Sequence, residues 1–170
     1  MNRIARFEKV SYEQFISDCS ALGYFCDNNM HSVYDDIPIP HRATAGSAGY
    51  DFFLPCQLTL EPQQTVTIPT GIRVFIENGW FLMCCPRSGL GFKYRVRLDN
   101  TIGIIDSDYY YAENGGHIMI RITNESLDGK TLSLDKNTAF AQGIFLPYGI
   151  TVDDNADSIR TGGFGSTSTI

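Results

Sequence analysis

Apolar and polar residues alternate in short runs along most of this chain. From about residue 48 onward, the runs are four to eight residues long, rich in β-branched and aromatic side chains, and separated by turn-forming residues. Such runs are typical of β-strands. The predicted strands read GYDFFL, QLTL, TVTI, GIRVFI, WFLMCC, IGII, HIMIRI, TLSL and GIFLPYGI. Asn78-Gly79 predicts a two-residue hairpin between GIRVFI and WFLMCC, and Asp128-Gly129 predicts another turn.

One segment near the N-terminus has a helical period instead. Its apolar positions recur three or four residues apart, at Tyr12, Phe15, Ile16, Cys19 and Leu22. Ser11 and Gln14 match a capping box, and Gly23 is a natural C-terminal stop. Because no helix interrupts the later strands, the chain is predicted to be all-β. We expect an antiparallel β-sandwich or jelly roll with one short N-terminal α-helix, over about residues 11–22, lying on a sheet.

The two ends of the chain lack this regularity. Residues 24–47 are irregular and contain two prolines, while the stretch after residue 152 has almost no apolar periodicity. At 170 residues, the chain is long enough for one domain with one hydrophobic core. We therefore predict a single domain over residues 1–159 and a flexible Gly-, Ser- and Thr-rich arm over residues 160–170.

Composition and charge exclude several classes of protein. A formal net charge of −6 argues against a nucleic-acid binder, which presents a basic face. No apolar run approaches the roughly 18 residues of a membrane helix, and the N-terminus lacks the apolar stretch of a signal peptide. A cytoplasmic protein without membrane contact is expected. A small anionic ligand would need local positive charge, from Arg87, Lys93, Arg95, Arg97, Arg121 or Arg160.

The cysteines and histidines do not form a metal-binding pattern. The five cysteines, Cys19, Cys26, Cys56, Cys84 and Cys85, are odd in number and contain no CxxC spacing. Adjacent strand residues point to opposite faces, so Cys84 and Cys85 cannot bind one metal together. The three histidines are isolated in the sequence. Small buried thiols are therefore expected, and zinc is not.

A first candidate site is the stretch PRSGLGFK, which follows a predicted buried strand. Arg87 offers several N–H donors, Ser88 adds a hydroxyl, and Gly89 allows a ligand to approach the backbone closely. This grouping suits a phosphate. From this segment alone, an arginine in an ordinary surface ion pair is an equally good interpretation.

A second candidate site is the stretch IGIIDSDYY. If IGII is a strand, Asp106 stands at its end, where a carboxylate can face a ligand without burial of a free charge. The ring of Tyr109 would then lie under a sugar or a base. Taken alone, a plain Asp-Ser-Asp turn followed by core aromatics is the favoured interpretation.

The third candidate site is RTGGFGSTS, within the predicted arm. Its backbone N–H groups and the Ser166 and Thr167 hydroxyls suit phosphates, and Phe164 suits stacking on a base. A disordered tail is the alternative. The stretch matches neither a P-loop nor a dinucleotide-binding fingerprint.

Taken in order, these stretches closely resemble the five motifs of the trimeric deoxyuridine triphosphatases (dUTPases). The matching segments are GSAGYD (46–51), PRSG (86–89), GIIDSDY (103–109), AFAQ (139–142) and GGFGST (162–167). The resemblance covers about 120 residues and leaves the N-terminal 40 or so outside. The chain departs from many relatives in three places. After Tyr109 it reads YYAENGGHI where many relatives have a short Arg-Gly-Glu turn. Its second motif continues to Lys93, and Arg160 lies one residue closer to the double glycine than in many relatives.

The resemblance implies hydrolysis of dUTP to dUMP and pyrophosphate, with Asp106 as general base on a water that attacks the α-phosphorus. It also implies Mg²⁺ bound to the phosphates, with no direct protein ligand and with Asp51 and Gln142 acting through water. Tyr109 would lie beneath the deoxyribose and exclude a 2′-hydroxyl.

The resemblance further implies a homotrimer with sites at the subunit interfaces. The base and sugar would be held by Asn100, Gly103, Ile105, Tyr109 and Phe164. The phosphates would be held by Arg87, Ser88, Gly89, Gln142, Arg160, Gly165, Ser166 and Thr167.

Two alternatives remain open at this point. A dCTP deaminase shares the jelly-roll scaffold but needs acid–base groups placed to convert the 4-amino group, and Glu113 is the only glutamate near the third motif. A nucleotide-sensing or partner-binding relative is the second alternative. Protein partners cannot be identified from this sequence.

Overall fold

A computed structural model describes residues 2–25, 29–158, 160 and 162. The elements follow the chain as β1 (Ala5–Lys9), α1 (Tyr12–Leu22), α2 (Met30–Asp35), β2 (His41–Arg42), β3 (Tyr50–Phe53), β4 (Leu58–Leu60), β5 (Thr65–Pro69), β6 (Ile72–Ile76), β7 (Trp80–Pro86), α3 (Ser88–Tyr94), β8 (Val96–Leu98), β9 (Gly103–Ile105), the 3₁₀ helix η1 (Ser107–Tyr111), β10 (Met119–Asn124), β11 (Leu132–Leu134) and β12 (Ala139–Pro147).

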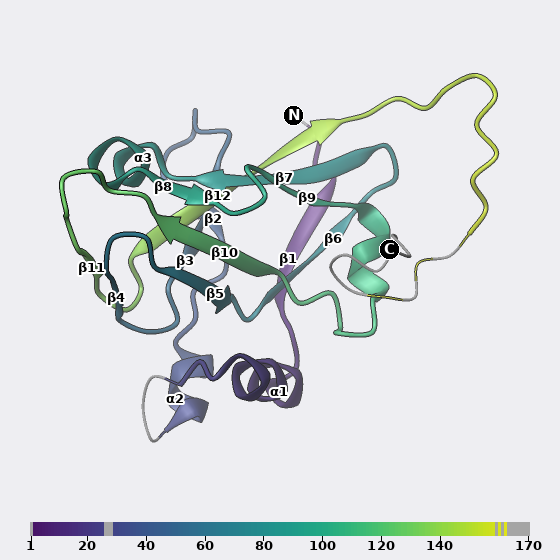
Figure 1. Cartoon of the computed structure of the whole chain (residues 1–170). Coiled ribbons are helices and arrows are strands. Elements are labelled where there is room, and N and C mark those ends of the chain that lie inside the picture. The colour runs from purple at the N-terminus through teal and green to yellow at the C-terminus, as the bar shows by residue number, and fades with distance from the viewer. Residues whose placement is uncertain (1, 26–28, 159, 161, 163–170) are drawn as a thin grey trace.

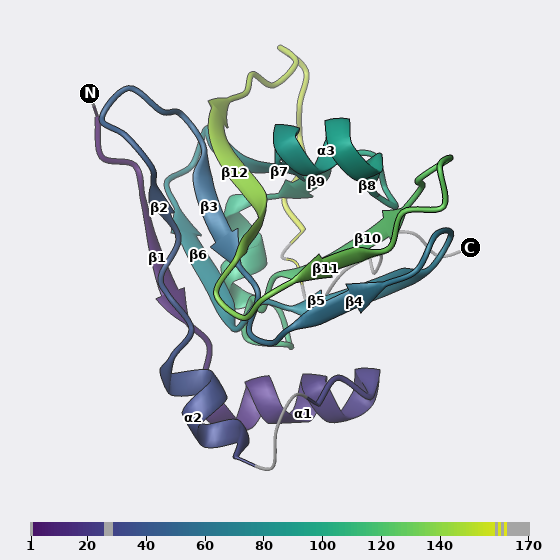
Figure 2. The same cartoon turned by 90° about the vertical axis from the view of Figure 1, so that its left-hand side faces the viewer.

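The strands form antiparallel sheets that enclose one core. The largest sheet has the order β2-β3-β12-β7-β9, and a second has the order β5-β10-β8. In two perpendicular views, β7 and β12 lie above β10 and β5, and α1 lies below β5 (Figures 1 and 2). Phe52, Leu82, Phe140 and Ile122 are fully buried in this core. The predicted all-β sandwich or jelly roll is confirmed.

The period of two in the sequence sets which side chains enter the core. In β7, Leu82 and Cys84 are buried, whereas Phe81, Met83 and Cys85 on the other face are half-buried. Across the sheet, Gly143 faces Leu82 and Phe52. A methyl group at Gly143 would lie 2.7 Å from Leu82 Cδ1, so the close packing of β12 against β7 requires glycine there.

Helix α1 confirms the predicted N-terminal helix. Ser11 Oγ accepts a hydrogen bond from the Gln14 backbone N–H at 3.1 Å, and Gly23 ends the helix in the left-handed conformation at φ 63°. Phe15 and Cys19 are its buried residues. The amide NH₂ of the Gln14 side chain donates to Asp18 Oδ2 at 2.9 Å.

Six elements of the described chain were not predicted: β1, β2, β8, α2, α3 and η1. Strand β1 carries three charged residues, of which only Arg6 is exposed, and it pairs along its whole length with β6. Helices α2 and α3 are short and lie in segments that are rich in turn-forming residues. The segment 24–47, predicted to be irregular, therefore contains α2 and β2.

The predicted hairpin at Asn78-Gly79 is wrong. The chain does turn there, with Gly79 at φ 85°, but β6 pairs with β1 while β7 pairs with β12 and β9. The turn therefore connects two sheets. The predicted turn at Asp128-Gly129 is present, with Gly129 at φ 69°.

The prediction of buried thiols holds for part of the cysteine set. Cys19 and Cys84 are free and buried, and burial raises the pKa of both thiols to about 12. Cys85 is free and half-buried. Cys56 is a correction, because it is disulfide-bonded. Within the described residues, no helix is both long and apolar enough to cross a membrane.

Candidate active site

Asp106 lies where β9 leaves the sheet. Gly103 and Ile105 face the core and Ile104 faces outward. This alternation fixes which face of β9 packs against the core. Asp106 then caps η1 in an extended conformation, and its side chain is 52% exposed. The predicted position of this carboxylate, at the end of a buried strand and in reach of solvent, is confirmed. The expected turn after it is a 3₁₀ helix.

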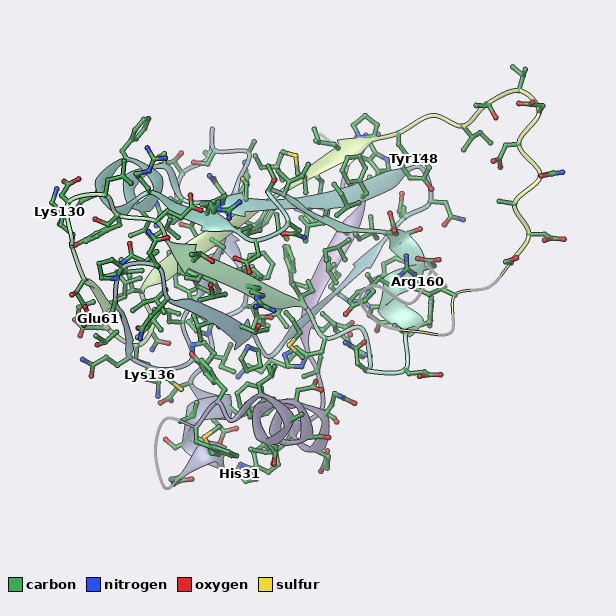
Figure 3. All side chains as sticks on the ribbon, in the orientation of Figure 1. His31, Glu61, Lys130, Lys136, Tyr148 and Arg160 are labelled. Carbon is green, nitrogen blue, oxygen red and sulfur yellow. The ribbon has the colours of Figure 1, made fainter. Side chains whose placement is uncertain are left out.

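Asp106 belongs to a charged cluster with Asp108 and Arg160. Figure 3 labels Arg160. Arg160 Nη2 lies 2.9 Å from Asp106 Oδ2, and Arg160 Nε lies 2.9 Å from Asp108 Oδ1. Burial raises the pKa of Asp106, the positive charge of Arg160 lowers it, and the negative charge of Asp108 raises it; the net pKa lies above the ordinary value. The cluster therefore holds a carboxyl group with an elevated proton affinity.

Tyr109 follows Asp106 by one turn of η1 and is 3% exposed. Its hydroxyl donates to the His117 carbonyl oxygen at 2.8 Å and accepts from Asn114 Nδ2 at 2.8 Å. Burial raises the pKa of Tyr109 to about 12, so the phenol is neutral near pH 7. The Arg160 guanidinium carbon lies 5.8 Å from the centre of the ring. The ring is thus fixed at its hydroxyl end and adjoins the charged cluster.

A cavity of about 370 Å³ lies beside β9. Three of the residues predicted to bind a base or sugar, Asn100, Gly103 and Ile105, line it together. The turn into β9 is tight, because the Thr101 N–H donates to the Leu98 carbonyl at 2.9 Å. The sequence prediction assigned no contact with the base or sugar to the other walls of this cavity, among them Thr67, Cys84, Asp99, Ile118, Met119 and Arg121. Arg121 was considered only as a source of positive charge for an anionic ligand. Ile118, Met119 and Arg121 belong to the predicted strand HIMIRI. The one sequence signal that linked this strand to the cavity was its position shortly after the third motif.

The predicted phosphate residues at the end of β7 form a second cluster. Arg87 caps α3, which begins with Ser88 and Gly89. Its Nη1 lies 3.4 Å from the buried Asp51 carboxylate of β3. Gln142 of β12 pairs with Asp51 in the sheet, and its Nε2 donates to the Pro86 carbonyl at 3.2 Å. The structure therefore brings together the three segments that carry the first, second and fourth motifs.

The two clusters lie at opposite ends of β7. Ile105 pairs with Leu82 in the antiparallel register, so Asp106 lies beside Phe81, six residues from Arg87 along the strand. At about 3.3 Å per residue, the separation is about 20 Å. Figure 1 shows the same arrangement, with α3 and η1 at different ends of the sheet. One chain by itself does not bring Arg87 and Asp106 to the same phosphate group.

Four predicted site residues, Phe164, Gly165, Ser166 and Thr167, lie outside the described residues. Among the described side chains, no group of three or more histidines, cysteines, aspartates or glutamates is arranged to hold a metal ion. The carboxylate and amide oxygens of Asp51 and Gln142 are the hard ligands that suit Mg²⁺ through intervening water.

This chain is similar to several known proteins. The family model described as dUTPase matches residues 35–168. The deoxyuridine 5′-triphosphate nucleotidohydrolase of Hahella chejuensis is 41% identical over 143 residues, which cover 79% of this chain and 90% of the relative. The crystal structure of the dUTPase from Streptococcus mutans superposes with a TM-score of 0.63 at 28% identity, over 85% of this chain and 97% of that chain.

A further solved structure shares the fold. A mutant dUTPase of phage phi11 of S. aureus superposes with a TM-score of 0.62 at 19% identity, over 92% of this chain and 98% of that chain. That phage enzyme is described as coordinating a structural Mg(II) ion.

Proposed function

Because this chain belongs to the dUTPase family and hydrolyses dUTP, we infer that Asp106 is the general base of the reaction. The observation that carries this proposal is the position of Asp106 at the end of β9. There, a half-exposed carboxylate directly follows Ile105, which lines the cavity together with Asn100 and Gly103. It also pairs with Arg160, whose guanidinium carbon lies 5.8 Å from the centre of the Tyr109 ring. A nucleoside bound in that cavity would direct its phosphates toward the charged cluster.

In this proposal, Asp106 accepts a proton from a water molecule that attacks the α-phosphorus in line. The water oxygen forms a bond to that phosphorus, the bond to the bridging oxygen of the β-phosphate breaks, and pyrophosphate leaves with the bridging oxygen. An elevated carboxyl pKa favours proton transfer from water. The products are dUMP and pyrophosphate.

Recognition of the base and sugar would depend on shape and on paired polar groups. The Asn100 amide and the backbone around Gly103 would read the edge of uracil. Cytosine presents a donor where uracil has an acceptor, which leaves buried polar groups unpaired. The buried ring of Tyr109 leaves no freedom to move away from a 2′-hydroxyl, so UTP would be excluded sterically.

We propose Mg²⁺ as the cofactor. It would neutralise the triphosphate charge, and Asp51 and Gln142 would hold it through water. The support is chemical, since Asp51 is a buried carboxylate close to Arg87, and the phage phi11 relative is described as coordinating a Mg(II) ion. With Mg²⁺ bound, the net charge of −6 does not oppose binding of an anion.

We also propose a homotrimer with sites between subunits. The separation of about 20 Å between Asp106 and Arg87 supports it, because a neighbouring subunit can supply Arg87, Ser88 and Gly89 to the phosphates. A second support is the outward face of the five-stranded sheet, where apolar side chains remain partly exposed: Phe81, Met83, Ile104, Ile144 and Leu146. The arm over residues 160–170, with Phe164, Gly165, Ser166 and Thr167, would close the site.

A four-nucleotide assay tests the function. The protein is mixed with Mg²⁺ and with dUTP, dCTP, dTTP or UTP, and pyrophosphate and ammonia are measured. We expect kcat/KM for dUTP to exceed each of the others by at least about tenfold, with no ammonia from dCTP. Ammonia release would instead identify a deaminase, and equal use of dUTP and UTP would contradict the proposed role of Tyr109.

The charged cluster makes a prediction about pH. Asp108 raises the pKa of Asp106 and Arg160 lowers it. Asp108→Asn therefore lowers the pKa of Asp106, and the acidic limb of the kcat/KM profile, where the base becomes protonated, moves to lower pH. Arg160→Ala moves the same limb to higher pH. If both variants moved the acidic limb of the profile in the same direction, that limb would not reflect the protonation of Asp106.

A further inference from the structure

Helix α1 is connected to Tyr109 through His117, whose ring bonds to Asp18 and whose backbone carbonyl accepts from the Tyr109 hydroxyl. We propose that Asp18 of α1 and His117 are positioning residues that hold Tyr109 for selection of the deoxyribose. This inference rests on the sugar-binding role of Tyr109 proposed above. Neither residue touches the ligand cavity with its side chain, and Asp18 lies outside the segment that the family model matches, residues 35–168.

The first link joins α1 to the core. His117 is fully buried, and its Nδ1 lies 2.6 Å from Asp18 Oδ2. Its Nε2 accepts a hydrogen bond from the Gly71 N–H at 2.8 Å. A nitrogen that accepts carries no proton, so the imidazole proton is on Nδ1 and is donated to Asp18. Both nitrogens of the ring are therefore occupied, and its orientation is fixed.

Asp18 is itself held in place. Gln14, one turn earlier in α1, donates its amide to Asp18 Oδ2 at 2.9 Å. Burial raises the pKa of Asp18, but the hydrogen bonds from His117 and Gln14 outweigh burial and lower the pKa below its usual value. Asp18 thus presents an ionised acceptor to His117 near neutral pH.

The second link joins His117 to Tyr109. The carbonyl oxygen of His117 accepts from the Tyr109 hydroxyl at 2.8 Å and from Asn114 Nδ2 at 3.1 Å. The same Nδ2 donates to the Tyr109 hydroxyl. The loop that carries these groups has little freedom, because a methyl group at Gly116 would lie 2.9 Å from the Tyr110 backbone. A shift of His117 would therefore move the Tyr109 hydroxyl.

His117 also precedes the wall of the ligand cavity. The next residues, Ile118 and Met119, line that cavity. Ile118 is fixed by its backbone, since its N–H donates to the Ile72 carbonyl at 2.9 Å and its carbonyl accepts from Thr70 Oγ1 at 2.7 Å. The entry into β10 is therefore held independently of the His117 ring, and the His117 side chain acts on the hydroxyl end of the Tyr109 ring.

The test is the ratio of kcat/KM for dUTP to kcat/KM for UTP. Asp18→Ala leaves the buried Nδ1–H of His117 without its acceptor. A buried donor without a partner costs free energy, so the His117 ring is expected to move toward another acceptor and to shift the Tyr109 hydroxyl with it. We expect the ratio to fall by about five- to tenfold. Asp18→Asn retains an oxygen acceptor and should keep the ratio within about twofold of wild type. Glu13→Ala, at an exposed position of the same helix, is the matched control and should leave the ratio unchanged.

A double-mutant cycle separates positioning from general destabilisation. Tyr109→Phe keeps the ring but removes its hydrogen bond to His117. If Asp18 acts through that bond, Asp18→Ala should lower the ratio far less in the Tyr109→Phe background than in wild type. A ratio that Asp18→Ala leaves within twofold of wild type, or equal effects in both backgrounds, would overturn the inference.

Failure of this inference is distinguishable from failure of the proposed function. Tyr109→Ala should lower the dUTP preference whatever Asp18 does, and if it does not, the role of Tyr109 itself is wrong. Melting temperatures are measured for every variant. If Asp18→Ala does not fold, Asp18→Ser is measured instead. Its side chain is too short to accept directly from His117 Nδ1 but leaves room for a water molecule, which holds the ring less firmly than the carboxylate does. The same fall in the ratio is expected, and a ratio within twofold of wild type would again overturn the inference.

Discussion

Asp106→Asn is expected to lower kcat for dUTP by about a thousandfold. The amide has nearly the same shape as the carboxylate but cannot accept a proton from water. Asp106 lies at the end of β9 with a half-exposed side chain, so the substitution removes no core packing. Binding of a non-hydrolysable dUTP analogue should therefore stay within about threefold of wild type. Rapid-quench kinetics and calorimetric titration measure the two quantities.

The control for this variant is Asp153→Asn, at an exposed position after β12, which should leave kcat unchanged. A kcat of Asp106→Asn within about tenfold of wild type would assign the base to another group. Loss of analogue binding with unchanged kcat would instead make Asp106 a binding residue.

Local signals in the sequence predicted local structure well. Ser11 and Gly23 define the ends of α1 through contacts made within a few residues. Asn78-Gly79 also turns the chain, but the pairing of the flanking strands depends on distant partners. Strand β7 pairs with β12, about 60 residues later in the chain. The turn could be predicted from two residues, whereas the partner strands could not.

The candidate site shows the same division. The position of Asp106 follows from the end of an apolar run, and the motifs identify the residues around it. The bond between Asp18 and His117 joins positions 99 residues apart. Neither residue carries a sequence signal of its own, since His117 is an isolated histidine and Asp18 lies on a helix with an ordinary amphipathic pattern. Only the packing of α1 below β5 brings the two together (Figure 2).

Arg87→Ala is expected to lower kcat/KM for dUTP by about a hundredfold or more. Arg87 is 42% exposed at the end of β7, so its N–H groups can reach a phosphate. Arg87→Lys keeps the charge but not the paired donors, and an intermediate loss of about tenfold is expected. Arg97→Ala is the matched control, because Arg97 is also half-exposed and pairs with Glu125 at 2.6 Å. If Arg87→Ala stays within about threefold of wild type, Arg87 does not bind phosphate.

Mixing two inactive variants tests whether Arg87 serves a neighbouring subunit. In a mixed trimer, a site at the boundary between an Arg87→Ala subunit and an Asp106→Asn subunit can hold both natural residues, Asp106 from the first and Arg87 from the second. With equal amounts and random assembly, half of the subunits supply Asp106 and half of their neighbours supply Arg87, so about a quarter of the sites are complete. Co-expression of the two chains should therefore restore about a quarter of the wild-type activity. If both residues act within one chain, no site is complete and no activity returns. The separation of about 20 Å between Asp106 and Arg87 along β7 favours restoration.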